Sequence, residues 1–341
     1  MAETVSQECG RVPGPFTGVI APMYTPVHPD GSLDLEGTSE MVRWLGDCGC
    51  VRSVFARSGM GKMFTFTVEE TRTFARAVRA ALPAGMGMLL AAGGEWLNRD
   101  SGGHADEDVY TAQAIELTRF AAEIGCAGAV HVLPAAIAPR AGETHHDVVY
   151  RYFRTVHDAT DTPILLYQPG GMPEPYRLSA SLLARLVELP RIAGLKLSTT
   201  DDAMFDPLAE VVRDSSFALI CGHEGYYAVG LCKGAVGVIG QGCNGYPEIL
   251  AAVDKRHRSG DAEGARRAQD DVWAGLRVTD GLDSSVALKQ YFARHGYRIG
   301  PWDRGGKPPY DDAVMDRVQS GLDALRRPYR QELALGPMGR L

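Results

Sequence analysis

A lysine within a short apolar run is the first candidate for chemistry in this 341-residue sequence. The run RIAGLKLS covers residues 191–198, and strand alternation would place Ile192, Gly194, Lys196 and Ser198 on one face. An interior position disfavours the ammonium ion, and the neutral amine is the nucleophile that condenses with a carbonyl to form a Schiff base. The alternative is a lysine paired with a carboxylate inside the fold.

The run before it, PILLY, ends at Tyr167, which shares a strand face with Leu165. Neighbouring strands lie about 4.8 Å apart, so pairing of the two runs would place this phenol beside Lys196. A phenol there can move the protons that carbinolamine formation and C–C cleavage require. The alternative is a tyrosine that caps the core and donates its hydroxyl to a backbone carbonyl.

A Ser-Gly turn follows an earlier apolar run, at Ser58 and Gly59. Such a turn after a strand offers amide N–H groups and a hydroxyl to an anion such as a carboxylate. The alternative is a turn that only reverses the chain.

Eight nearly continuous apolar runs must position these residues. They begin at Gly18, Val51, Gly85, Ala127, Pro163, Arg191, Ser216 and Ala235. Runs without polar alternation are typical of parallel strands that are covered on both faces, and amphipathic helical patterns separate them. The pattern predicts an α/β fold, a (β/α)8 TIM barrel, whose site lies at the carboxyl ends of the strands. A doubly wound sheet is the second choice, but no GxGxxG follows the first run.

Helical patterns also fill the last hundred residues, after the eighth run. PEILAAVDKRH suits the eighth barrel helix, and the patterns at 261–278, 284–296 and 311–327 form a C-terminal helical extension. We therefore expect a barrel over residues 16–258 and a helical appendage over 259–341. Earlier in the chain, Thr67 and Glu70 have the spacing of a helix capping box.

Composition excludes several classes of protein. The net charge is −7 and no basic run occurs, which argues against binding to nucleic acid or to an anionic membrane. No apolar stretch is long enough to span a bilayer, and the start MAETVSQECG does not resemble a secretory signal. The seven cysteines are scattered and odd in number, which favours reduced thiols in the cytoplasm and no zinc site.

The order of these motifs resembles the dihydrodipicolinate synthase / N-acetylneuraminate lyase family of class I, Schiff-base-forming aldolases. The similarity runs from Phe16 to Lys289 and includes GVIAPMYTPVHPDGSLD, AIELTRFAAEIG, TPILLY, IAGLK and GAVGVIG. It implies that Lys196 forms the Schiff base with a 2-oxo acid such as pyruvate and that Tyr167 transfers protons. It places Ser58 and Gly59 at the carboxylate-binding turn, and it implies no metal, no cofactor and a homodimer or homotetramer.

The resemblance also adds pocket residues. Ser198 falls where sugar-acid lyases of the family carry a hydroxyl, and Ile239 and Gln241 would line the same pocket at the end of the eighth run. Glu224 falls at a position that holds a polyhydroxy tail in the neuraminate lyases, although Gly225 replaces the second acid of that loop.

Departures from the family pattern exclude dihydrodipicolinate synthase itself. Its GTTGE turn reads Ala-Arg-Ser-Gly-Met at 56–60, its tyrosine pair is replaced by Ala135-Ala136, and no arginine follows Tyr167 at the expected place. Arg57, which replaces the first threonine of that turn, either binds the substrate carboxylate in a bidentate manner or pairs with Glu224 or another loop acid. The long loop at 93–104 is either a lid or a surface loop.

The sequence therefore predicts a lyase, an aldolase or dehydratase, that acts on a 2-oxo acid through a Schiff base on Lys196. Two other functions stay open. One is a barrel that binds a 2-oxo acid or sugar acid as a sensor, without turnover. The other is a barrel that binds phosphate at the glycine-rich end of the eighth run and uses Lys196 only for its charge.

Overall fold

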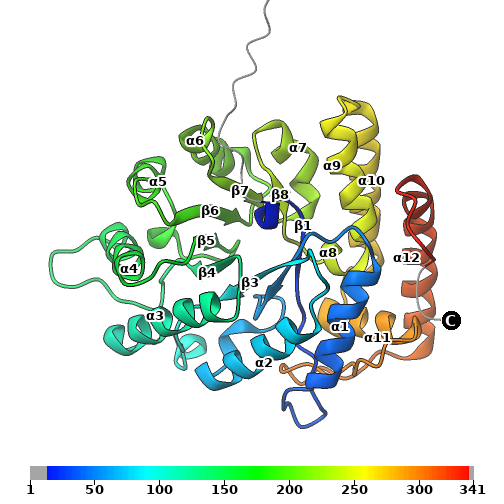
Figure 1. Ribbon diagram of the computed structural model, residues 1–341, viewed down its shortest axis with the longest axis horizontal. Coiled ribbons are helices and arrows are strands. Elements are labelled where there is room, and N and C mark those ends of the chain that lie inside the picture. Colours follow the sequence, from blue (N-terminus) through cyan, green and yellow to red (C-terminus); the bar gives the residue numbers. More distant parts are fainter. Residues whose placement is uncertain (1–13, 338–341) are drawn as a thin grey trace, which may run out of the picture.

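Residues 14–337 are described by the computed structural model, and they contain one closed barrel of parallel strands in the order β1-β2-β3-β4-β5-β6-β7-β8. Figure 1 shows these strands at the centre with helices around them. Strands adjacent in sequence are adjacent in the barrel, and β8 closes it by pairing with β1. The predicted (β/α)8 barrel is confirmed, and the doubly wound alternative is wrong.

The strands are short and buried, as the unbroken apolar runs predicted. They are β1 (Gly18–Pro22), β2 (Ser53–Ala56), β3 (Gly87–Ala91), β4 (Gly128–Val132), β5 (Ile164–Gln168), β6 (Ile192–Leu197), β7 (Ala218–Cys221) and β8 (Gly237–Val238). Most apolar runs extend past the strand ends. Met23 and Tyr24, for example, are fully buried beyond β1, because apolar character reports burial rather than strand pairing.

Helices follow the strands. The barrel helices are α1 (Leu35–Asp47), α2 (Val68–Ala81), α3 (Glu107–Glu123), α4 (His145–Ala159), α5 (Ala180–Val187), α6 (Asp202–Val212), α7 (Tyr227–Cys232), the short α8 (Gly242–Gly245) and α9 (Pro247–Arg258). Helices α1 to α6 each begin after a residue whose side chain accepts a hydrogen bond from the first turn. The Thr67 side chain accepts from the Glu70 amide, and the Glu70 carboxylate accepts from Thr67 N–H. The predicted capping box at α2 is thereby confirmed.

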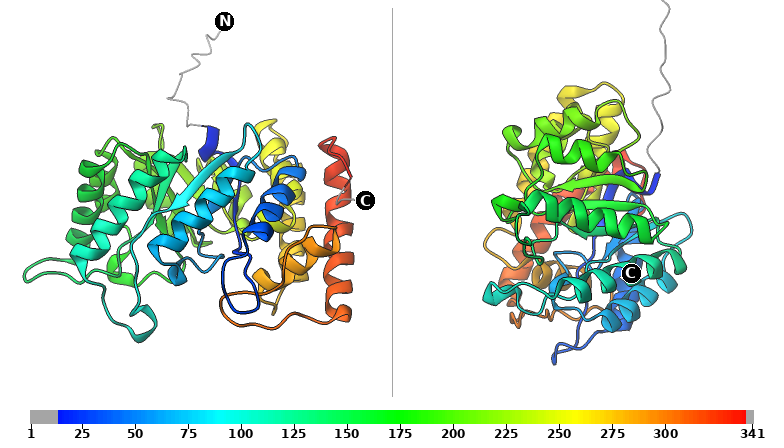
Figure 2. Two further views of the ribbon diagram at one scale, coloured as in Figure 1. Left: turned by 60° about the horizontal axis from the view of Figure 1, so that its bottom comes forward. Right: turned by 90° about the vertical axis from the view of Figure 1, so that its left-hand side faces the viewer.

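Three further helices follow the barrel: α10 (Ala262–Val278), α11 (Ser284–Arg294) and α12 (Asp312–Glu332). Figures 1 and 2 show them on the side of the barrel that carries α1 and α9. The last helix is longer than predicted, since α12 continues through Pro328 to Glu332. Buried Tyr329 and Arg330 anchor this final turn, which offsets the hydrogen bond that a proline cannot donate.

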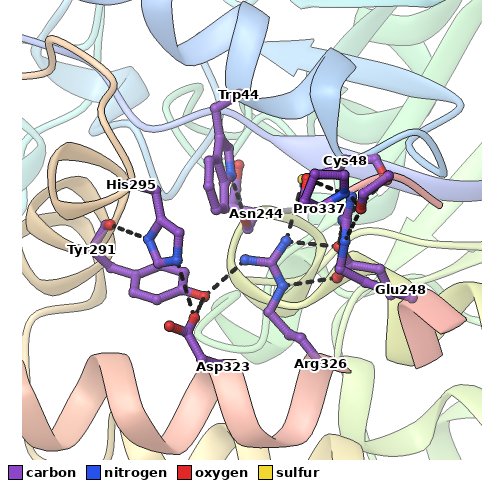
Figure 3. A network of polar contacts seen from close by, with 11 residues as sticks. Trp44, Cys48, Asn244, Glu248, Tyr291, His295, Asp323, Arg326 and Pro337 are labelled. Carbon is purple, nitrogen blue, oxygen red and sulfur yellow. Dashed lines mark hydrogen bonds and ion pairs between the residues drawn. The ribbon is translucent and has the colours of Figure 1, made fainter. Parts of the chain in front are cut away.

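A buried charge network joins α12 to the barrel (Figure 3). Arg326 donates from Nε and Nη2 to the two carboxylate oxygens of Glu248 on α9, at 2.9 and 2.7 Å. Arg330 donates to the same carboxylate, and Arg326 Nη1 donates to the Tyr291 hydroxyl of α11. The Arg326 guanidinium also lies 4.8 Å from the Trp44 ring of α1. One carboxylate therefore ties the C-terminal helix to the barrel through two cations.

No helix within residues 14–337 is both long and apolar enough to cross a bilayer. Cys9 lies outside the described residues, and the cysteines inside them carry free thiols.

Candidate active site

Lys196 and Tyr167 meet at the carboxyl ends of β5 and β6. The two residues are partners in the strand register, downstream of an irregularity between Ile164 and Leu165. Lys196 is 4% exposed, and its Nζ lies 4.1 Å from the centroid of the Tyr167 ring and 5.7 Å from that of Phe55. Among the described residues no ion pair involves Lys196, so the alternative of a lysine paired with a carboxylate is wrong.

The turn after β2 lies directly against this pair. A Cβ placed on Gly59 would lie 3.4 Å from the Tyr167 hydroxyl oxygen. Ser58 shapes the turn, because its carbonyl accepts from Gly61 and Met63 and its hydroxyl donates to the carbonyl of Met23 at 2.8 Å. Within residues 14–337 the amide hydrogen of Gly59 has no protein acceptor. The turn therefore places a free backbone donor next to the phenol.

A cleft of about 510 Å³ opens above the turn and the tyrosine. Its lining is mainly apolar, with one cation and one anion. The lining residues are Gly59, Met63, Phe64, Trp96, Arg99, Asp100, Val132, Leu133, Ala135, Tyr167, Pro169, Gly171, Met172 and Pro173. The carboxyl ends of β4 and β5 and the loops after β2, β3, β4 and β5 supply these residues, so the cleft lies at the barrel end where the fold places active sites.

Arg57 is turned away from this cleft. Its Nε donates to the carbonyl of Met63 at 3.2 Å, and its Nη1 donates to the carbonyls of Ala91 at 3.3 Å and Gly93 at 2.8 Å. The residue is 3% exposed, and burial lowers the pKa of its guanidinium to about 10. Its backbone has a φ of 52°, an uncommon left-handed conformation for a residue with a side chain. Of the two alternatives for Arg57, pairing with Glu224 or another loop acid is wrong, because backbone carbonyls receive the guanidinium. The other, bidentate binding of the substrate carboxylate, is not supported by the cleft lining, which does not include Arg57.

Glu224 is also directed into the fold. It is 4% exposed, and its Oε1 accepts from the amide of Gly242 at 2.9 Å and from the Tyr246 hydroxyl at 3.5 Å. A Cβ on Gly240 would lie 2.0 Å from the other carboxylate oxygen, so the glycine at this position makes room for the acid. The carboxylate therefore stabilises the start of α8, and the cleft lining does not include it.

The remaining predicted pocket residues lie at the ends of β6 and β8. The Ser198 hydroxyl donates to the carbonyl of Gly222 at 3.2 Å, and Ile239 is 1% exposed. Gln241 donates from Nε2 to the Thr279 hydroxyl at 3.1 Å. Among the described residues, Tyr167 and Gly59 line the cleft, and Lys196 lies against the Tyr167 ring. Ser198, Ile239 and Gln241 do not belong to the cleft lining.

No group of three or more histidine, cysteine or acidic residues that could hold a metal ion occurs in residues 14–337.

Comparison with known proteins now identifies the family. The model of the dihydrodipicolinate synthetase family matches residues 15–279. The chain belongs to this family. A 4-hydroxy-tetrahydrodipicolinate synthase from Laribacter hongkongensis is 28% identical over 311 residues, which cover 91% of this chain and 98% of that protein. An uncharacterized DapA-like lyase from Pyrococcus horikoshii is 26% identical over 296 residues, 86% of this chain and 94% of the relative.

Solved structures share the fold of this chain. The N-acetylneuraminate lyase of Mycoplasma synoviae aligns with a TM-score of 0.74 at 20% identity, covering 91% of this chain and 98% of its own. A prophage protein of E. coli K12 from the dihydrodipicolinic acid synthase family, solved in complex with pyruvate, aligns with a TM-score of 0.74 at 22% identity. That alignment covers 94% of this chain and 99% of the prophage protein.

Several cleft residues of this family member were not predicted from the sequence. Met63, Phe64 and Met172 are apolar and follow strand ends, where nothing in the sequence separates a pocket wall from a core side chain. The sequence did point to Trp96 and Arg99, because they lie in the long loop 93–104 at the active-site end of the barrel. The structure shows that this loop forms a wall of the cleft.

Proposed function

We propose that this protein is a Schiff-base-forming lyase that acts on a 2-oxo acid. The observation that carries the proposal is the position of Lys196 Nζ, buried in the barrel and 4.1 Å from the centroid of the Tyr167 ring at the base of the cleft. A lysine held there without an ion-pair partner is suited to attack a carbonyl that enters past Tyr167. Family membership and a pyruvate-bound structural neighbour support the choice of a 2-oxo acid.

The chemistry follows from the imine. Lys196 Nζ attacks C2 of the substrate, and the carbinolamine loses one water as the C2–Nζ double bond forms. In the aldolase reaction the C4 hydroxyl gives up its proton, C4 leaves as an aldehyde, and the electron pair of the C3–C4 bond passes into the protonated imine to give an enamine; protonation at C3 and hydrolysis by one water return the shortened 2-oxo acid and the free amine. In the dehydratase reaction a proton leaves C3 to give the enamine, which expels the C4 hydroxyl as water with one added proton; hydrolysis of the resulting unsaturated imine by one water returns the dehydrated 2-oxo acid and the free amine. Tyr167 is the group placed to carry these protons.

The turn at Ser58 and Gly59 would hold the substrate carboxylate. The Gly59 amide has no acceptor within the described residues and lies beside the Tyr167 hydroxyl. An amide donor orients a carboxylate, which directs C2 toward Lys196. Arg57 supports this turn through the Met63 carbonyl rather than through the substrate.

A barrel that binds phosphate at the end of β8 is disfavoured by Glu224. Its side chain already accepts from the Gly242 amide, so a buried acid occupies the position that a phosphate would need.

Borohydride trapping tests the proposed function. The protein is incubated with pyruvate, reduced and mapped by peptide mass. We expect a reduced adduct on the Lys196 peptide that is lost in Lys196→Met. Lys289→Met is the matched control, because Lys289 is a second buried lysine, whose pKa burial lowers to about 8. The proposal fails if no adduct forms, or if the adduct is on Lys289.

A further inference from the structure

The loop 93–104 presents an arginine to the cleft. Arg99 Cζ lies 4.1 Å from the centroid of the Phe64 ring, so the guanidinium is stacked on the cleft wall. Phe64 in turn packs edge-on against Trp96, with ring centroids 6.2 Å apart. The Trp96 Nε1 donates to the carbonyl of Gly103 at 2.7 Å, which closes the loop on itself. The arginine therefore has a fixed platform although it lies on a loop.

Contacts at the base of this loop hold the platform in place. The Glu95 carboxylate accepts from the amide of Val68 at the start of α2, at 2.7 Å. The Glu95 amide donates to the Gln113 side chain of α3 at 2.8 Å. Arg57 donates to the carbonyl of Gly93, the first residue of the loop. Because the loop is tied to two helices and to the end of β2, the position of Arg99 is set before a substrate arrives.

The charges of the cleft single out Arg99. Among the described residues that line the cleft, Arg99 is the one cation and Asp100 the one anion. The Asp100 side chain is fully exposed and reaches Arg99 only at 4.0 Å, which is the weak geometry of a surface pair. The Arg99 side chain is 47% exposed, so its guanidinium remains open to a ligand.

We propose that Arg99 binds a terminal carboxylate at the far end of the substrate. This inference rests on the proposed function and narrows it to a class of substrate, a 2-oxo acid with an apolar middle and a second carboxylate. The turn at Gly59 would hold the first carboxylate, and the apolar Met63, Leu133 and Met172 line the same cleft as Gly59 and Arg99. The planar guanidinium donates two parallel hydrogen bonds to a carboxylate, a geometry that a lysine cannot supply.

A pair of 2-hydroxy acids tests Arg99 without any imine. 2-Hydroxyadipate and 2-hydroxyhexanoate have the same carbon chain, and only the first carries a terminal carboxylate. Neither has a carbonyl that could react with Lys196, so their binding by titration calorimetry reports on the cleft alone. We expect the diacid to bind about tenfold more tightly, as a charge-assisted hydrogen bond at a half-exposed site supports. Added salt should reduce the difference.

Two variants decide whether Arg99 is responsible. Arg99→Gln should remove the preference for the diacid and leave the affinity for 2-hydroxyhexanoate unchanged. Arg76→Gln is the matched control, because Arg76 is an exposed arginine that also stacks on a phenylalanine, at 5.0 Å from the Phe120 ring, but does not line the cleft. It should keep the preference.

The outcomes separate this inference from the proposed function. Equal binding of the two acids by the wild-type protein, or a preference that persists in Arg99→Gln, would overturn the role of Arg99 even if pyruvate is trapped on Lys196. A failure to trap pyruvate would overturn the lyase, whereas a diacid preference that depends on Arg99 would still establish the carboxylate subsite.

Discussion

Replacing Glu248 by glutamine should destabilise the fold strongly while leaving the cleft intact. The Glu248 carboxylate is fully buried and neutralises two arginines whose side chains are 1% and 6% exposed. Burial acts to raise the pKa of Glu248, but Arg326 and Arg330 hold it below its usual range. Glu248→Gln keeps the shape of the side chain and removes its charge. The two buried guanidinium groups then lose the carboxylate that pairs with both of them.

The expected loss is about 3–5 kcal/mol of unfolding free energy, the usual cost of breaking a buried ion pair from one side. A matched control joins the same two helices at the surface, since Glu332 of α12 pairs with Arg256 of α9. Both of its side chains remain partly exposed, 29% and 23%. Glu332→Gln should therefore cost at most about 1 kcal/mol.

Urea unfolding followed by circular dichroism measures both variants against the wild-type protein. The free energies are compared at equal m-values, so that a change in the unfolded state is not counted as stability. A loss of less than about 1 kcal/mol for Glu248→Gln, or equal losses for the two variants, would refute the reasoning. Such a result would mean that water or a rearranged acid compensates for the missing charge.

Three further perturbations have defined outcomes. Tyr167→Phe should slow exchange of the pyruvate methyl protons with deuterium by about 100-fold, measured by NMR, because it removes the proton carrier; an unchanged rate would exclude that role. Burial lowers the pKa of His131 to about 3, so the unfolded chain takes up a proton there first and stability falls as the pH drops from about 6.5 to 3. That part of the acid destabilisation, on the order of 5 kcal/mol, should be missing from the pH profile of His131→Gln; an identical slope would contradict it. Gly222→Ala would place a Cβ 2.4 Å from the Ser198 hydroxyl and should cost about 1–3 kcal/mol in thermal unfolding. Gly171→Ala meets no atom within 4 Å and should cost far less, so equal melting temperatures for the two alanine variants would show that Ser198 moves aside freely.

Local sequence patterns were sufficient to predict the barrel and the placement of Tyr167 beside Lys196. Unbroken apolar runs indicate strands that are covered on both faces. Because eight such runs alternate regularly with helical patterns, they predict a closed parallel barrel. Tyr167 and Lys196 could be placed together because each lies at the end of its run and the two runs follow one another. The capping box at Thr67 and Glu70 was predictable for the same reason, since both partners lie within one helical turn.

The orientation of long charged side chains was decided only by tertiary structure. Arg57 and Glu224 both follow barrel strands, and the sequence could not show that backbone carbonyls bind the first and a helix start binds the second. Nor could it show that Arg99 stacks on Phe64 at the cleft, because the two lie on loops that follow different strands. Strand alternation fixes the direction of a side chain within a strand. Beyond the strand end, contacts between distant segments choose the conformation, so the sequence determined the barrel and its lysine while the folded chain determined the rest of the cleft.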